Sequence, residues 1–198
     1  MQQPQVIFLD AVGTLFGVRN SVGEVYGQLA RRVGVEVEAL PLNQAFIQSF
    51  QAAPRAVFPG VAAADLPSYE FRWWQAIAAQ SFERVGALHQ FSDFPRFFSD
   101  LYAHFATAEP WIVYADVRPM LKYWQTVGIQ LGVISNFDRR LYSVLEALDL
   151  APFFTSITIS TEAGAAKPDP QIFGAALEKH GGRALHAWHI GDSLRDDY

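Results

Sequence analysis

The chain has 198 residues, of which 51% are hydrophobic, 14% aromatic and 18% charged. This supplies enough apolar side chains for one packed domain, or for a domain with a smaller inserted one, and excludes the class of intrinsically disordered chains. The formal net charge of -5, without a lysine or arginine run, argues against a nucleic-acid partner. The absence of cysteine excludes disulfides, thiolate metal sites and a cysteine nucleophile.

The N-terminus lacks the basic and apolar segments of a signal peptide, and no apolar stretch is long enough to span a bilayer. These features predict a soluble cytoplasmic protein without a membrane partner. Its partner is expected to be a small molecule, and the oligomeric state is left open.

Short apolar runs alternate with helical patterns in the sequence around a long insertion. Strands are predicted at residues 5–9, 129–134, 155–160 and 187–190, and helices at residues 117–127, 138–150 and 170–180. Strands that alternate with helices of this length form a parallel sheet, whose ligands lie beyond the carboxyl ends of the strands. Polar residues at those ends are therefore expected to gather in one crevice.

The insertion, residues 17–114, is rich in alanine and aromatic residues and has no buried-strand pattern. Helical stretches such as 22–32 and 69–84 indicate an inserted helical domain, and the core is assigned to residues 1–16 and 115–198. Because a doubly wound sheet normally continues, the natural protein is expected to be longer by about one strand and one helix.

The predicted strand ends carry polar groups of complementary chemistry. Carboxylates there can attack phosphorus or ligate a hard cation, and hydroxyl and ammonium groups can hold the transferring oxygens. The residues concerned are Asp10, Thr14, Ser135, Asn136, Lys167, Asp192 and Asp197.

Four segments in order resemble the motifs of the haloacid dehalogenase-like hydrolase superfamily. They are Asp10-Ala11-Val12-Gly13-Thr14-Leu15, Ile134-Ser135-Asn136, Lys167-Pro168-Asp169, and Gly191-Asp192-Ser193 followed by Asp197. The helical insertion between the first two is similar to the cap of the superfamily's first cap class. The resemblance implies a Rossmann-like α/β core with an inserted helical cap domain.

The resemblance also implies roles for individual residues. Asp10 would be the nucleophile that forms an aspartyl-phosphate, Thr14 and Ser135 would hydrogen-bond the phosphoryl oxygens, and Lys167 would neutralise charge. Gly13 and Asn136 are assigned to substrate binding.

A Mg²⁺ ion is implied as cofactor, with a small phosphorylated molecule as substrate. The carboxylates of Asp10 and Asp192 and the main-chain carbonyl of Val12 would be its ligands. Asp197 would orient the metal shell from outside it, with Asp196 as its out-of-register neighbour.

Val12 departs from the family pattern, because phosphatases of this superfamily usually carry a second aspartate there as general acid and base. That function is worth about 10² to 10⁴ in rate, so a weak phosphatase is predicted. Two alternatives stay open: an L-2-haloacid dehalogenase, whose departing halide needs no proton, and a catalytically inactive binding or interaction protein. The presence of Asp192 and Asp197 favours metal and phosphate.

Two further groups of residues are assigned no catalytic role. The aromatic run from Phe71 to Trp74 is expected in a helical core. None of the five histidines shows metal-ligand spacing on a helix face, and His189 is expected to pack within its strand.

Overall fold

The computed structural model describes residues 3–198, so residues 1 and 2 of the predicted core and N-terminus lie outside it. The chain folds into two compact units. The sheet unit comprises residues 3–17, 56–66 and 111–198, and the helical unit comprises residues 18–55 and 67–110. The sequence assigned residues 17, 56–66 and 111–114 to the helical insertion, whereas in the structure they belong to the sheet unit.

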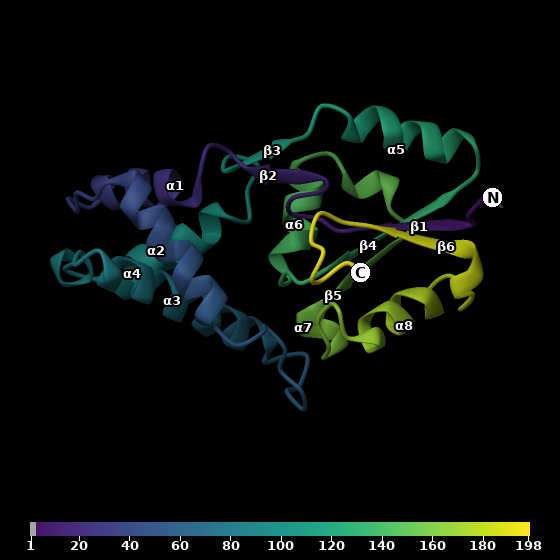
Figure 1. Cartoon of the computed structure of the whole chain (residues 1–198). Coiled ribbons are helices and arrows are strands. Elements are labelled where there is room, and N and C mark those ends of the chain that lie inside the picture. The colour runs from purple at the N-terminus through teal and green to yellow at the C-terminus, as the bar shows by residue number, and fades with distance from the viewer. Residues whose placement is uncertain (1–2) are drawn as a thin grey trace. The chain divides into compact units, whose positions relative to one another are not determined.

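The sheet unit is built on a four-stranded parallel sheet (Figure 1). Its strands, in the order β5-β4-β1-β6, are Ser156–Ile159, Gln130–Ser135, Val6–Leu9 and Ala187–Ile190. Each coincides with a predicted strand to within one residue at either end. The α/β, Rossmann-like fold class predicted from the sequence is confirmed.

Helices connect these strands and cover the sheet, with α5 and α8 on opposite sides of it (Figure 1). The elements are α5 (Val117–Thr126), α6 (Arg140–Ala147), α7 (Ser160–Ala163), α8 (Pro170–Glu178), and the 3-10 turns η2 (Ala151–Phe153) and η3 (Ala184–His186). Asp169 caps α8 by accepting a hydrogen bond from the main-chain N–H of Gln171, with proline at the first helical position, as predicted. The four-residue α7 was not predicted.

The core of the sheet unit lies between the strands and these helices. Val6, Phe8 and Ile134 form a buried cluster with Ile172 of α8. Gly132 in β4 leaves room for its neighbours, because a Cβ there would come within 2.7 Å of the Phe8 ring and of Ser156 Oγ. Close packing thus fixes the relative positions of the strand ends that carry the polar residues.

A short ribbon of β2 (Phe16–Val18) and β3 (Trp111–Val113) was not predicted. It lies where the chain leaves the sheet unit and where it returns to it. Phe16 and Trp111 are buried and meet edge to face, with ring centroids 5.2 Å apart.

The helical unit contains four helices and a 3-10 turn: α1 (Val22–Arg32), α2 (Ala39–Ala52), α3 (Leu66–Arg84, of which the first residue belongs to the sheet unit), η1 (Leu88–Gln90) and α4 (Phe94–His104). Ser21 and Asp93 cap α1 and α4 through their side chains. Phe71 of the aromatic run contacts Phe98 edge to face at 4.9 Å, so it belongs to the core of this unit. Trp73 Nε1 donates a hydrogen bond to Pro54 O at 2.9 Å.

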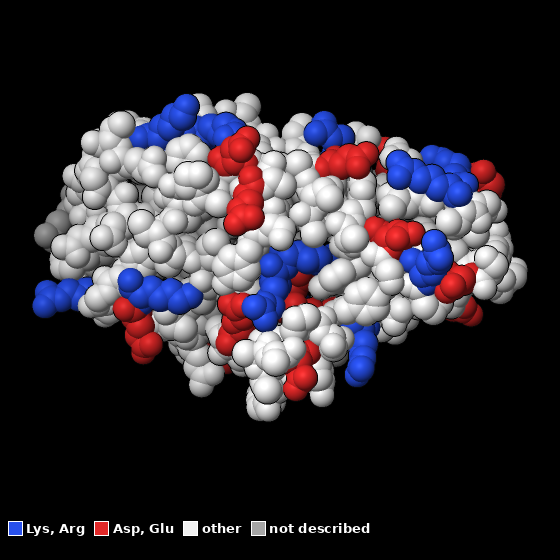
Figure 2. All heavy atoms as spheres, turned by 180° about the vertical axis from the view of Figure 1, so that it is seen from behind, with Lys and Arg blue, Asp and Glu red and all other residues white. Residues whose placement is uncertain are grey.

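None of the helices formed by residues 3–198 is long and apolar enough to cross a membrane. On the face shown in Figure 2, acidic and basic side chains are interspersed among uncharged ones.

Candidate active site

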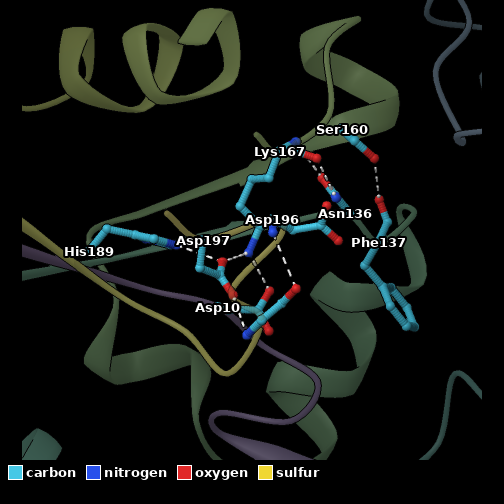
Figure 3. A network of polar contacts seen from close by, with 9 residues as sticks. Asp10, Asn136, Phe137, Ser160, Lys167, His189, Asp196 and Asp197 are labelled. Carbon is cyan, nitrogen blue, oxygen red and sulfur yellow. Dashed lines mark hydrogen bonds and ion pairs between the residues drawn. The ribbon is translucent and has the colours of Figure 1, made fainter. Parts of the chain in front are cut away.

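The four motifs converge at the carboxyl edge of the sheet. Asp10 directly follows β1, and its main-chain N–H donates to the carbonyl of Ile190 at the end of β6 (2.9 Å). Ser135 ends the adjacent strand β4, and Lys167 lies in the loop between α7 and α8. Figure 3 shows Asp10, Lys167, Asp197 and His189 pointing toward one another.

Lys167 is the centre of this cluster. Its ammonium lies 2.7 Å from Asp10 Oδ1 and 2.6 Å from Asp197 Oδ1, and its side chain is 2% exposed. A buried ammonium is tolerated only when it is paired and hydrogen-bonded, and two carboxylates satisfy that condition here. The structure therefore brings together three of the predicted site residues from segments far apart in the chain.

Asp197 receives hydrogen bonds from three segments. Besides the Lys167 ammonium, His189 Nε2 lies 2.8 Å from Oδ1, and the main-chain N–H of Ser193 donates to Oδ2 at 3.0 Å. Burial would raise the pKa of Asp197, but these donors outweigh it and lower the pKa below its usual value. Asp197 is therefore an ionised acceptor at neutral pH.

Asp10 has the opposite electrostatic balance. Burial raises the pKa of its carboxyl group, the nearby Lys167 ammonium opposes the rise, and the charge of Asp197 adds to it. The Asp10 carboxylate is thus incompletely compensated by the protein. A further positive charge beside it would favour its ionised form.

Asn136 holds the loop that carries Lys167. Its Nδ2 donates to the Lys167 carbonyl at 3.0 Å, and its Oδ1 accepts from the Lys167 N–H at 2.7 Å. The sequence assigned Asn136 to substrate binding, whereas here both polar atoms of its amide engage the main chain of Lys167.

Gly13 allows a close approach between the first and fourth motifs. Its φ of 101° lies in the left-handed region, and a Cβ there would come within 2.4 Å of Asp192 Oδ2. Gly13 thus permits the Asp192 carboxylate to lie against the loop that follows Asp10.

Thr14, in the same loop, has a buried hydroxyl without a hydrogen-bond partner among residues 3–198. Ser135 is also buried, at 3% exposure. An orphaned buried hydroxyl is a feature that calls for a ligand or a bound water.

The oxygen donors suited to a cation at this edge are few. No group of three or more histidine, cysteine, aspartate or glutamate side chains that could hold a metal lies within residues 3–198. Mg²⁺ is usually held by one or two carboxylates and keeps several waters. The expected ligands Asp10 and Asp192 supply two carboxylates, the number that such a site needs, and Val12 lies in the loop that follows Asp10.

His189 is a member of the cluster that the sequence analysis did not assign. Its ring contacts Asp197 and also meets the ring of Phe173 edge to face, with centroids 5.3 Å apart. A histidine within an otherwise apolar strand is the signal that the sequence carries. Its partner lies eight residues later, in a loop whose course spacing does not determine.

Comparisons with known proteins identify the family. The family model described as haloacid dehalogenase-like hydrolase matches residues 4–198. Haloacid dehalogenase-like hydrolase domain-containing protein 3 from Bos taurus is 35% identical over 197 residues, covering 99% of this chain and 77% of the relative.

Two solved structures share the fold. The L-2-haloacid dehalogenase from Xanthobacter autotrophicus aligns with a TM-score of 0.67 and 18% identity, covering 98% of this chain and 72% of the other. A HAD phosphatase from Thermococcus onnurineus aligns with a TM-score of 0.61 and 20% identity, covering 98% and 79%. Because the family model matches residues 4–198 and the Bos taurus relative is 35% identical, this chain belongs to the haloacid dehalogenase-like hydrolase family.

Proposed function

We propose that this protein is a Mg²⁺-dependent phosphatase that hydrolyses a small phosphorylated metabolite through an aspartyl-phosphate on Asp10. The observation that carries the proposal is the buried ammonium of Lys167, held 2.7 Å from Asp10 Oδ1. An Asp10 oxygen attacks phosphorus, the bond to the leaving oxygen breaks, and water then cleaves the aspartyl-phosphate to inorganic phosphate. Lys167 offsets negative charge on the nucleophile and on the transferring group.

The hydroxyls of Thr14 and Ser135 would donate to the phosphoryl oxygens. The Thr14 hydroxyl is buried without a partner among residues 3–198, and leaving such a group unsatisfied costs about 1–3 kcal/mol. A phosphoryl oxygen in this position would satisfy it. Gly13 would contribute by keeping the loop close to Asp192.

The carboxylates of Asp10 and Asp192 and the carbonyl of Val12 would hold Mg²⁺, and Asp197 would act from outside the metal shell. Burial raises the pKa of Asp10, because the nearby Lys167 ammonium only partly compensates its negative charge. When bound, the ion would supply further positive charge and stabilise the ionised carboxylate. Asp197 is unsuited to direct ligation in this arrangement, because its two oxygens already accept three N–H donors.

Val12 restricts the substrates that such a site can turn over. Valine cannot protonate a leaving alkoxide or activate water, and general acid and base help is worth about 10² to 10⁴ in rate. Esters with a weakly basic leaving group, such as an activated aryl phosphate, need that help least. We expect the activity to fall steeply as the pKa of the leaving alcohol rises.

The test is turnover of a panel of phosphate esters, including an activated aryl phosphate, with Mg²⁺ and with a chelator. Turnover should need Mg²⁺ and should be lost in Asp10→Asn. It should persist in Asp100→Asn, a matched change of an exposed aspartate on α4. Absence of turnover by the wild-type protein on every ester would contradict the proposal.

Val12 also favours a second candidate, a 2-haloacid dehalogenase, because departing halide needs no proton. That activity would release halide from a small 2-haloacid in the presence of chelator. A protein that binds fluoroberyllate but turns over neither substrate class would instead be a binding module that retains the pocket.

A further inference from the structure

The ammonium of Lys167 lies beside Asp10 and is also held by a second carboxylate, that of Asp197. The distances of 2.7 Å to Asp10 and 2.6 Å to Asp197 leave it shared almost equally. If the Asp197 carboxylate rotated, the ammonium would lose its contact with Asp197 Oδ1. The orientation of Asp197 therefore sets the position of the charge beside the nucleophile.

Two groups besides Lys167 fix that orientation, and they differ in how firmly they are held. Ser193 belongs to the same loop as Asp197, and the main-chain N–H of Asp197 donates back to the Ser193 carbonyl at 2.9 Å. His189 belongs to β6 and lies in register with Phe8 of the central strand β1. The contact of His189 with Asp197 thus joins the loop to the sheet (Figure 3).

The protonation of the His189 ring follows from its surroundings. Asp197 Oδ1 is a carboxylate oxygen that can only accept, so the nitrogen 2.8 Å away, Nε2, carries the hydrogen. Nδ1 is buried without a partner among residues 3–198, so a hydrogen there would have no acceptor. Burial lowers the pKa of His189, which agrees with a neutral ring protonated on Nε2.

We propose that His189 is a positioning residue of this site: it donates from Nε2 to Asp197 and thereby holds the Lys167 ammonium against Asp10. This role rests on the proposed function, since it concerns the charge that assists attack by Asp10. His189 touches neither the nucleophile nor the transferring group in this arrangement. It acts on Asp10 through Asp197 and Lys167.

The contribution of the hydrogen bond can be separated from that of packing by two substitutions of similar size. Glutamine places an N–H donor near the position of Nε2, whereas methionine fills the space without a donor. We expect His189→Met to lower kcat by about 10- to 100-fold with KM changed less than about twofold, the range typical of residues that orient functional ligands. His189→Gln should recover most of that loss.

His180 provides the matched control in the same unit. It is a partly buried histidine that lies 2.6 Å from Ser156 Oγ and 2.7 Å from Gln130 Oε1, at the amino ends of β5 and β4. His180→Met should lower the unfolding midpoint without changing kcat. Equal kcat values for His189→Met and wild type, or equal losses in His189→Met and His180→Met, would overturn the positioning role.

A spectroscopic measurement tests the geometry without activity. Two-bond ¹H–¹⁵N spectra of protein labelled at histidine should show His189 as the neutral Nε2–H tautomer at pH 7. A ring protonated on Nδ1, or an exchanging mixture, would overturn the inference even if the protein is an active phosphatase. If the wild-type protein turns over no ester, the proposed function fails, and the tautomer alone decides whether His189 holds Asp197.

Discussion

The two ends of the sheet each carry a polar cluster that includes a histidine, and the clusters differ in charge. At the amino end, the ring of His180 lies between two uncharged side chains and contacts Ser156 Oγ and Gln130 Oε1. A cavity of about 630 Å³ lies beside it. At the carboxyl end, His189 contacts Asp197, which is paired with the ammonium of Lys167, and Lys167 is paired in turn with Asp10.

The clusters also differ in how many of their buried polar atoms have a hydrogen-bond partner. Both ring nitrogens of His180 have partners, whereas His189 Nδ1 and the Thr14 hydroxyl have none among residues 3–198. Burial also raises the pKa of Asp10 at the carboxyl end. Within the described part of the chain, buried polar atoms without a partner are the feature that the carboxyl end has and the amino end lacks, and such atoms are typical of sites that bind a ligand or a water.

The largest effect is expected from adding a carboxyl group at position 12 of the carboxyl-end cluster. Val12→Asp should raise turnover of alkyl phosphates by about 10² to 10⁴, because the new carboxyl can protonate the leaving oxygen and activate water. Initial rates on alkyl and aryl phosphates measure the effect, and the gain should be smaller on aryl phosphates. An unchanged rate on both would mean that the remaining residues do not form a phosphatase site.

Removing the buried cation should break the charged cluster. Lys167→Met leaves Asp10 and Asp197 without their shared counter-ion, and removal of one partner from a buried ion pair costs about 3–5 kcal/mol. Denaturant unfolding measures the loss in the free energy of unfolding. Lys179→Met is the control at the other end of α8, where the exposed ammonium donates to Ile157 O, and it should cost less than about 1 kcal/mol.

The packing between the two clusters can be tested at Gly132. Gly132→Ala places a methyl group within 2.7 Å of both the Phe8 ring and Ser156 Oγ, and overpacking of this kind costs about 1–3 kcal/mol. Gly174→Ala in α8 is the control, since a Cβ there meets no atom within 4 Å and alanine favours a helix. A thermal melt of each variant should show opposite shifts, and similar shifts would contradict the packing argument.

The smallest effect concerns the pH dependence of the uncharged cluster. Burial, aided by Lys179, lowers the pKa of His180 below its usual value of 6.5. The unfolded chain therefore binds a proton more readily than the folded one, so this histidine stabilises the fold fully above pH 6.5 and less as the pH falls below it. The urea midpoint should drop between pH 7.5 and 5.5, and the drop should be smaller in His180→Gln.

The strand ends were predictable from the sequence because each follows a buried apolar run, as at Asp10 and Ser135. Motif order then indicated that Lys167 would join them. The pairing of Asn136 with the main chain of Lys167 was not predictable, because it depends on how a loop 31 residues away folds back. The link from His189 to Asp197 was hidden for the same reason.

The assignment of residues 56–66 to the sheet unit also could not be predicted from the sequence. This stretch shows no strand or helix periodicity, and its attachments are made by distant side chains. Ser160 Oγ donates to Ala56 O and Arg139 Nη1 donates to Ala63 O, each at 3.2 Å. Such long-range hydrogen bonds leave no local pattern.

Because residues 56–66 belong to the sheet unit, the chain passes between the two units four times. The helical unit is therefore not one continuous insertion with only two connections to the sheet unit. A chimera made by exchanging residues 18–110 with a relative would also replace an eleven-residue piece of the sheet unit, together with the acceptors that Ser160 and Arg139 use. Recombination at all four junctions, keeping residues 56–66 in place, is the exchange that respects how this molecule is divided.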